Sequence, residues 1–101
     1  MNESSLIYEV MQALGKHGAV YRCNSGQFKL SNGKWFRGMS KGFSDILFIR
    51  ADGKACFVET KADRGRLTEE QARFLEQMRG LNCIAGVART VEEALALCGV
   101  G

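Results

Sequence analysis

Two apolar segments separated by three residues constrain the fold of this chain most strongly. Residues 44–50 and 55–61 are rich in apolar side chains, and Ala51-Asp52-Gly53 lies between them. This spacing predicts an antiparallel hairpin whose loop is a type I turn followed by glycine in the left-handed conformation. A three-residue loop pairs position 45 with position 59, whereas a two-residue loop would pair position 45 with position 60. We expect the first register, because Gly53 lies where that loop geometry favours glycine.

The expected register brings three charged residues together. It places Asp45 opposite Glu59, and Lys61 follows two residues along the same face because strand side chains alternate. Two close carboxylates repel each other unless they share a proton or a cation. A hard ion such as Mg²⁺ prefers oxygen ligands and can polarise a phosphodiester, while a lysine can stabilise the negative charge that develops. A structural ion pair of Lys61 with one carboxylate is the alternative interpretation.

The remaining sequence predicts helices and further strands around this hairpin. Apolar residues at helical spacing between Leu6 and Leu14 predict an opening helix with Ser4 or Ser5 as its N-cap. Capping-box patterns predict two further helices. The expected elements are a helix near 5–15, strands at 19–23, 44–50, 55–61 and 84–88, a small hairpin of 27–30 with 34–37, and helices beginning at 68 and 90. This order predicts an α/β fold with a mixed sheet flanked by helices.

Length and composition favour one small intracellular domain. A chain of 101 residues is expected to form a single domain, here residues 1–101. No apolar run approaches the length of a membrane helix, and Glu3 and Glu9 argue against a signal peptide. The four cysteines form no C-x-x-C pair, so we expect reduced thiols, a cytoplasmic location and no contact with a membrane.

The charge distribution is uneven along the chain. Residues 16–66 carry eleven basic and four acidic side chains, a net +7, whereas residues 1–15 and residues 67–101 each carry −2. A basic middle segment favours a polyanionic partner such as DNA, with scattered surface charge as the alternative. Trp35 and Phe36 in this segment could stack on unpaired bases or pack in a dimer interface, and packing is favoured. The candidate phosphate contacts are Arg22, Ser25, Lys34, Arg37, Lys41, Arg64 and Arg66.

Three short motifs together resemble one known family. Gly42-Phe43-Ser44-Asp45, Phe57-Val58-Glu59-Thr60-Lys61 and Leu67-Thr68-x-x-Gln71 are similar to the VRR-Nuc family of the PD-(D/E)XK nuclease superfamily. The resemblance extends over nearly the whole chain, and one departure is that Ser44 replaces the proline of the superfamily's name. It implies a restriction-endonuclease-like core and a deoxyribonuclease that depends on Mg²⁺ or Mn²⁺.

The resemblance also implies roles for individual residues. Asp45, Glu59 and the backbone carbonyl of Thr60 would be metal ligands, and Lys61 would be the catalytic lysine. Glu9 would project from the first helix toward the metal, unless it is a solvated helix residue. Gln71 would approach the active site or the substrate, although its capping-box position already gives it a backbone partner.

Partners and biological setting are likewise expectations from the resemblance. Stand-alone members of this size resemble Holliday-junction resolvases, which implies a homodimer that acts on branched or junction DNA in a bacterial or phage-infected cell. Compact stand-alone VRR-Nuc domains resemble phage proteins. Two other classes of protein remain open: a catalytically inactive nucleic-acid-binding module, and a structural or protein-interaction domain.

Overall fold

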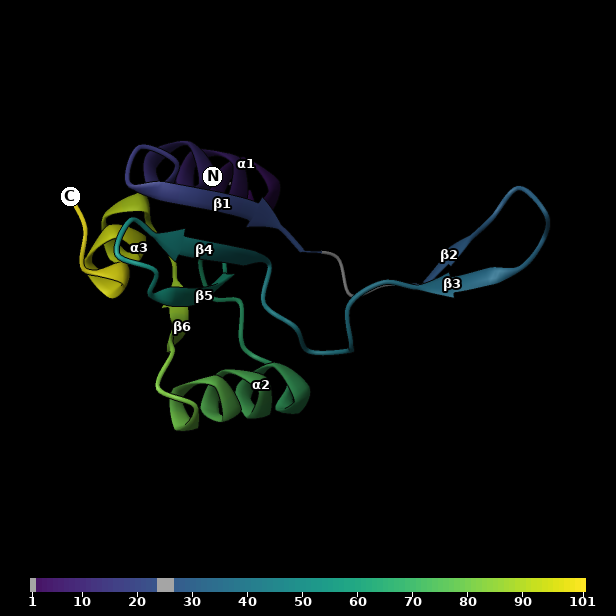
Figure 1. The fold of residues 1–101 in the computed structure, drawn as a ribbon. Coiled ribbons are helices and arrows are strands. Elements are labelled where there is room, and N and C mark those ends of the chain that lie inside the picture. Colours follow the sequence, from purple (N-terminus) through teal and green to yellow (C-terminus); the bar gives the residue numbers. More distant parts are fainter. Residues whose placement is uncertain (1, 24–26) are drawn as a thin grey trace.

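A mixed four-stranded sheet lies at the centre of the fold (Figure 1). The computed structural model describes residues 2–23 and 27–101. Across the sheet, the strands are β1 (Gly18–Arg22), β4 (Ile46–Arg50), β5 (Ala55–Thr60) and β6 (Ile84–Ala88). Neighbouring strands run antiparallel, except that β5 and β6 run parallel. The expected α/β fold with a mixed sheet is therefore confirmed.

The hairpin of β4 and β5 has the predicted register. Ile46 pairs with Val58, and the N–H of Arg50 donates to the carbonyl of Lys54 at 2.9 Å, which leaves a three-residue loop. Gly53 has a φ of 89°, as this loop requires. Position 45 therefore faces position 59 at the open end of the hairpin.

Helices cover both faces of the sheet. The helix α1 (Glu3–Leu14) and the helix α3 (Val91–Cys98) pack on one face, and α2 (Glu69–Gly80) packs on the other (Figure 1). Strand alternation explains the two cores, because Val58 belongs to the first and Phe57 to the second. Among the described residues, no helix combines the length and apolar character needed to cross a membrane. All four cysteines are free, as expected.

The helix caps follow the sequence with two differences. The side chain of Asn2, and not Ser4 or Ser5, caps α1 by accepting the N–H of Ser5 at 2.8 Å. This cap starts the helix at Glu3, and asparagine is as good an N-cap as serine. The box at Thr68 is complete, whereas at Thr90 the carboxylate of Glu93 accepts the N–H of Arg89 instead of closing the box.

The small hairpin forms a ribbon of its own. The strands β2 (Gln27–Lys29) and β3 (Trp35–Arg37) pair antiparallel, and they form a separate two-stranded sheet. The turn between them is the predicted Ser31-Asn32-Gly33, in which the side chain of Asn32 accepts the N–H of Lys34 at 3.0 Å. We call residues 27–37 the arm, because this ribbon extends away from the central sheet and its helices (Figure 1).

Candidate active site

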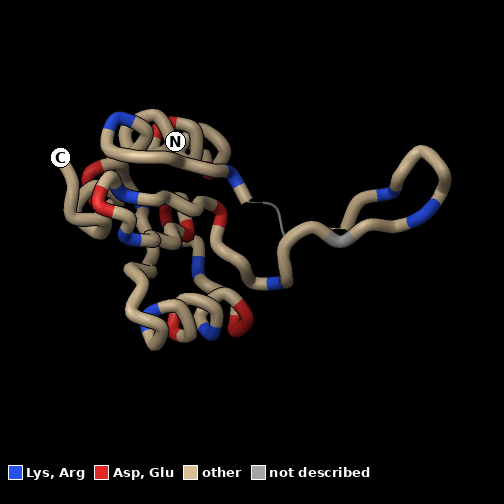
Figure 2. Tube along the Cα trace, in the orientation of Figure 1, with Lys and Arg blue, Asp and Glu red and all other residues tan. Residues whose placement is uncertain are grey.

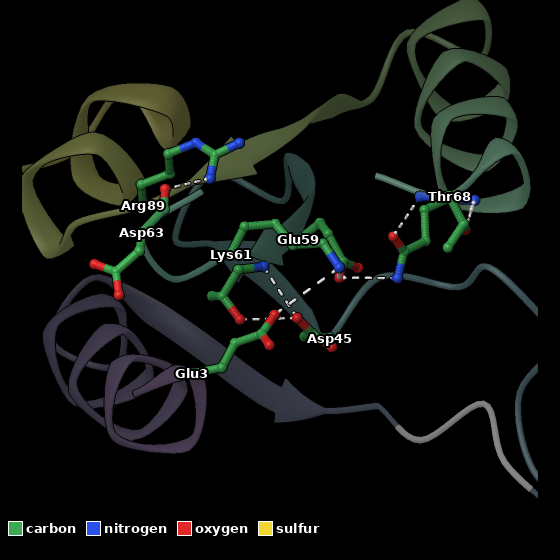
Figure 3. Close-up of polar contacts among 9 residues, drawn as sticks. Glu3, Asp45, Glu59, Lys61, Asp63, Thr68 and Arg89 are labelled. Atoms are coloured by element: carbon green, nitrogen blue, oxygen red, sulfur yellow. Dashed lines mark hydrogen bonds and ion pairs between the residues drawn. The ribbon is translucent and has the colours of Figure 1, made fainter. Parts of the chain in front are cut away.

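Three carboxylates meet at the open end of the central hairpin (Figure 3). One oxygen from each of Glu3, Asp45 and Glu59 lies within 4.8 Å of the other two. The three residues come from different elements: Glu3 from the first turn of α1, Asp45 from the residue before β4, and Glu59 from the end of β5. We call this group the acidic cluster.

Asp45 is held in one orientation by the neighbouring strand. Its Oδ2 accepts the backbone N–H of Thr60 at 3.0 Å and the hydroxyl of Thr60 at 2.8 Å. Its backbone carbonyl accepts the N–H of Cys23 at 2.8 Å, just beyond the end of β1. Thr60 is fully buried, so its two donors are fixed by packing. The protein therefore positions the Asp45 carboxylate before any ligand binds.

The carboxylate of Glu59 is buried, and hydrogen bonds from the described residues satisfy only one of its two oxygens. Only 2% of the residue is exposed, and among the described residues its Oε1 has no hydrogen-bond partner. Its Oε2 accepts a hydrogen bond from the Nε2 of Gln71 at 3.3 Å. Burial, followed by the nearby carboxylate of Asp45, raises the pKa of Glu59 to about 8. An unpaired buried carboxylate oxygen is costly, so this position favours a bound proton or cation.

Lys61 supplies the positive charge of this group. Its Nζ lies 3.7 Å from Oε2 of Glu59 and 3.9 Å from Oε1 of Glu3, and 14% of its side chain is exposed. The ion pair with Glu59 that the sequence left as an alternative is therefore present. One ammonium group faces three carboxylates, so a divalent cation would balance the charge of the fully ionised cluster.

Gln71 performs both tasks that the sequence suggested. Its side-chain oxygen accepts the N–H of Thr68 at 3.0 Å in the capping box, while its Nε2 donates to Glu59. The segment before Asp45 packs closely against the first turn of α2 at Gly42. A side chain would not fit there, because a Cβ at Gly42 would lie 2.6 Å from the backbone of Glu70. Both contacts fix the first turn of α2 beside the acidic cluster.

Glu9 lies outside the acidic cluster, in contrast to the expectation for this residue. It lines a separate hollow of about 290 Å³ together with Leu6 and Arg89. Helix geometry explains the difference, because a residue six positions after Glu3 lies about 9 Å further along α1 and is turned by about 120°. The helix carboxylate at the cluster is Glu3. Its signal in the sequence was Asn2, a strong N-cap residue that makes Glu3 the first residue of the helix.

Four of the candidate phosphate contacts lie at exposed positions on segments next to those that carry the acidic cluster. Arg22 lies at the end of β1, Lys41 precedes Asp45, and Arg64 and Arg66 lie between β5 and α2. Lys41 also pairs with Glu70 at 3.6 Å. Lys34 lies on the arm at an exposed position, Arg37 belongs to β3, and Ser25 lies outside the described residues.

Comparison with known proteins identifies the family and the fold of this chain. The sequence model of the VRR-NUC domain matches residues 7–92. A solved structure described as a VRR_NUC domain shares the fold with a TM-score of 0.70 at 23% identity, covering 98% of this chain and 96% of that chain. No curated protein matches the sequence. Because the domain model spans most of its length, the chain belongs to the VRR-NUC domain family, a nuclease-type family.

Proposed function

We propose that this protein is a DNA endonuclease that uses Mg²⁺ or Mn²⁺ to hydrolyse phosphodiester bonds. The observation that carries the proposal is the burial of Glu59, a member of the acidic cluster whose Oε1 has no partner among the described residues. Three carboxylates from separate elements form the hard-oxygen donor set that these cations prefer. The residues present therefore fit the cation that the nuclease family suggests.

Asp45 and Glu59 would hold the cation, with the backbone carbonyl of Thr60 as a further ligand and Glu3 approaching from α1. When bound, a divalent cation neutralises charge on the phosphodiester and makes a coordinated water more acidic. The chain itself contributes orientation and charge. Thr60 fixes Asp45, Gln71 fixes Glu59, and Lys61 stabilises the negative charge that develops on the phosphate.

DNA is the proposed substrate because exposed cations flank the cluster. Arg22, Lys41, Arg64 and Arg66 are exposed and would contact the phosphates on either side of a scissile bond. We further propose that the chain acts as one domain on branched or junction DNA. Since the described residues contain a single cluster of three carboxylates, two symmetrical cuts would require a homodimer.

The direct test is cleavage of labelled DNA. We expect the protein to cut a four-way junction or a fork with Mg²⁺ or Mn²⁺ and to be inactive in EDTA, with slower cutting of a duplex of the same sequence. Tight, salt-sensitive binding of the junction with no cutting in either metal would instead identify a catalytically inactive binding module. Absence of both binding and cutting would contradict the proposal entirely.

A further inference from the structure

The arm lies on a segment that carries only positive charge. Residues 16–44 contain six Lys and Arg side chains and no Asp or Glu. Lys29 and Lys34 lie on the arm itself, and Figure 2 shows basic positions along it with no acidic one in the described part. A protruding ribbon with this charge matches a polyanion and repels another copy of itself.

Both ends of the arm lead to the acidic cluster. On one side, β1 ends at Arg22, and the N–H of Cys23 donates to the carbonyl of Asp45. On the other side, residues 38–44 run directly from β3 to Asp45. The arm is therefore joined on both sides to segments that reach Asp45, and because it extends away from the sheet (Figure 1), a nucleic acid that reaches beyond the acidic cluster would contact it.

The arm presents aromatic side chains that its own fold leaves exposed. Phe28 and Phe36 are directly paired across the ribbon and share a face, with exposures of 43% and 55%. Leu30 continues this face at 45% exposure. Trp35, at 66% exposure, lies on the opposite face beside Lys29. The sequence favoured packing of Trp35 and Phe36 in a dimer interface, which stays a prediction; within this chain both side chains are exposed.

We propose that the arm recognises branched DNA, with Phe28 and Phe36 stacking on unpaired bases and the basic side chains contacting the adjacent phosphates. Aromatic side chains interleaved with cations are the usual platform for unpaired bases, because every base has a face that can stack. This inference rests on the proposed function, since it takes the substrate at the acidic cluster to be DNA. It gives a physical origin to the preference for branched substrates.

The test compares the double variant Phe28→Thr/Phe36→Thr with the wild type in EDTA, so that no cutting occurs. Threonine keeps strand propensity and pairs well across strands, but it removes the aromatic faces. The DNA probes are a duplex, a fork of the same sequence, and that fork with 2-aminopurine at its first unpaired base. We expect the affinity for the fork to fall about tenfold or more, the affinity for the duplex to fall less than about threefold, and the change in 2-aminopurine emission on binding to be lost.

Two matched variants complete the experiment. Phe28→Tyr/Phe36→Tyr retains aromatic faces and is expected to preserve fork affinity, whereas Tyr8→Ala removes an aromatic of 64% exposure on α1 and is expected to change neither affinity. Equal losses for fork and duplex, or no loss for either, would overturn the proposal. So would dissociation of a wild-type dimer in the threonine variant, measured by sedimentation, because the arm would then be a self-association surface. Binding in EDTA does not depend on cleavage. A protein that binds forks through the arm but cuts no DNA with Mg²⁺ or Mn²⁺ would therefore contradict the proposed nuclease activity and not the role of the arm.

Discussion

Replacement of Lys61 by alanine is expected to slow metal-dependent DNA cleavage by about 100- to 1,000-fold. The ammonium group of Lys61 lies beside Glu59 and Glu3, where a phosphodiester held by the acidic cluster would develop negative charge. Because the side chain is 14% exposed and already paired, the affinity for DNA should change by much less than the rate. Single-turnover cleavage of a labelled junction with Mg²⁺, together with binding in EDTA, separates these two effects.

Lys54 and Asp63 provide matched controls for this measurement. Lys54 precedes the other end of β5, where its Nζ donates to the carbonyl of Asn82 at 2.6 Å, and Lys54→Ala should cut at the wild-type rate. Asp45→Ala should be as inactive as Lys61→Ala, whereas Asp63→Asn changes an exposed carboxylate outside the cluster and should be active. Cutting at the wild-type rate by either Lys61→Ala or Asp45→Ala would exclude the proposed site.

The second large effect concerns the stability of the metal-free protein at different pH values. In the folded chain the pKa of Glu59 is about 8, well above the ordinary glutamate value of 4.5, so the folded state binds this proton more tightly than the unfolded state. The stability contributed by Glu59 is therefore complete below about pH 4.5 and is lost as the pH rises through 8. In EDTA, the free energy of unfolding should fall by up to about 1.4 kcal/mol per pH unit across this window.

Glu59→Gln isolates this contribution. Glutamine retains the shape of the side chain but does not titrate, so the variant should show little of this decline and should be more stable than the metal-free wild type at pH 8. Mn²⁺ should stabilise the wild type at pH 8 but not Glu59→Gln, which lacks a ligand. Urea unfolding at pH 5.5, 7 and 8 measures both effects, with Glu76→Gln on the exposed side of α2 as the control. Identical pH slopes for wild type and Glu59→Gln would show that Glu59 does not carry the effect.

The central hairpin and two of its carboxylates could be predicted from local sequence because their positions depend on short-range rules. Gly53 determines the loop, the loop determines the register, and the register places Asp45 opposite Glu59. The capping box of Gln71 was also predictable from local sequence, whereas its approach to Glu59 was an expectation from the family resemblance. In these cases a few adjacent residues specify the geometry.

Glu3 and the arm show where local rules were insufficient. The approach of Glu3 depends on Asn2 being the cap and on how α1 packs against the sheet, which is set by distant core residues. The arm was predicted as a hairpin, but its separation from the central sheet was not, because no local pattern states which sheet a hairpin joins. Glu9 was assigned through the family resemblance, and the turn of the helix places it elsewhere.

The most direct test of the metal site is an isothermal titration calorimetry experiment in which Mn²⁺ is added to the metal-free protein at pH 7. Repeating it in two buffers of different ionisation enthalpy gives the number of protons released on binding. With a pKa of about 8, Glu59 holds its proton in most metal-free molecules at this pH, so a cation that binds its ionised form must displace that proton. We predict that the wild type binds Mn²⁺ with release of close to one proton, and that Asp45→Ala loses this binding. Absence of Mn²⁺ binding by the wild type, or undiminished binding by Asp45→Ala without proton release, would contradict the account.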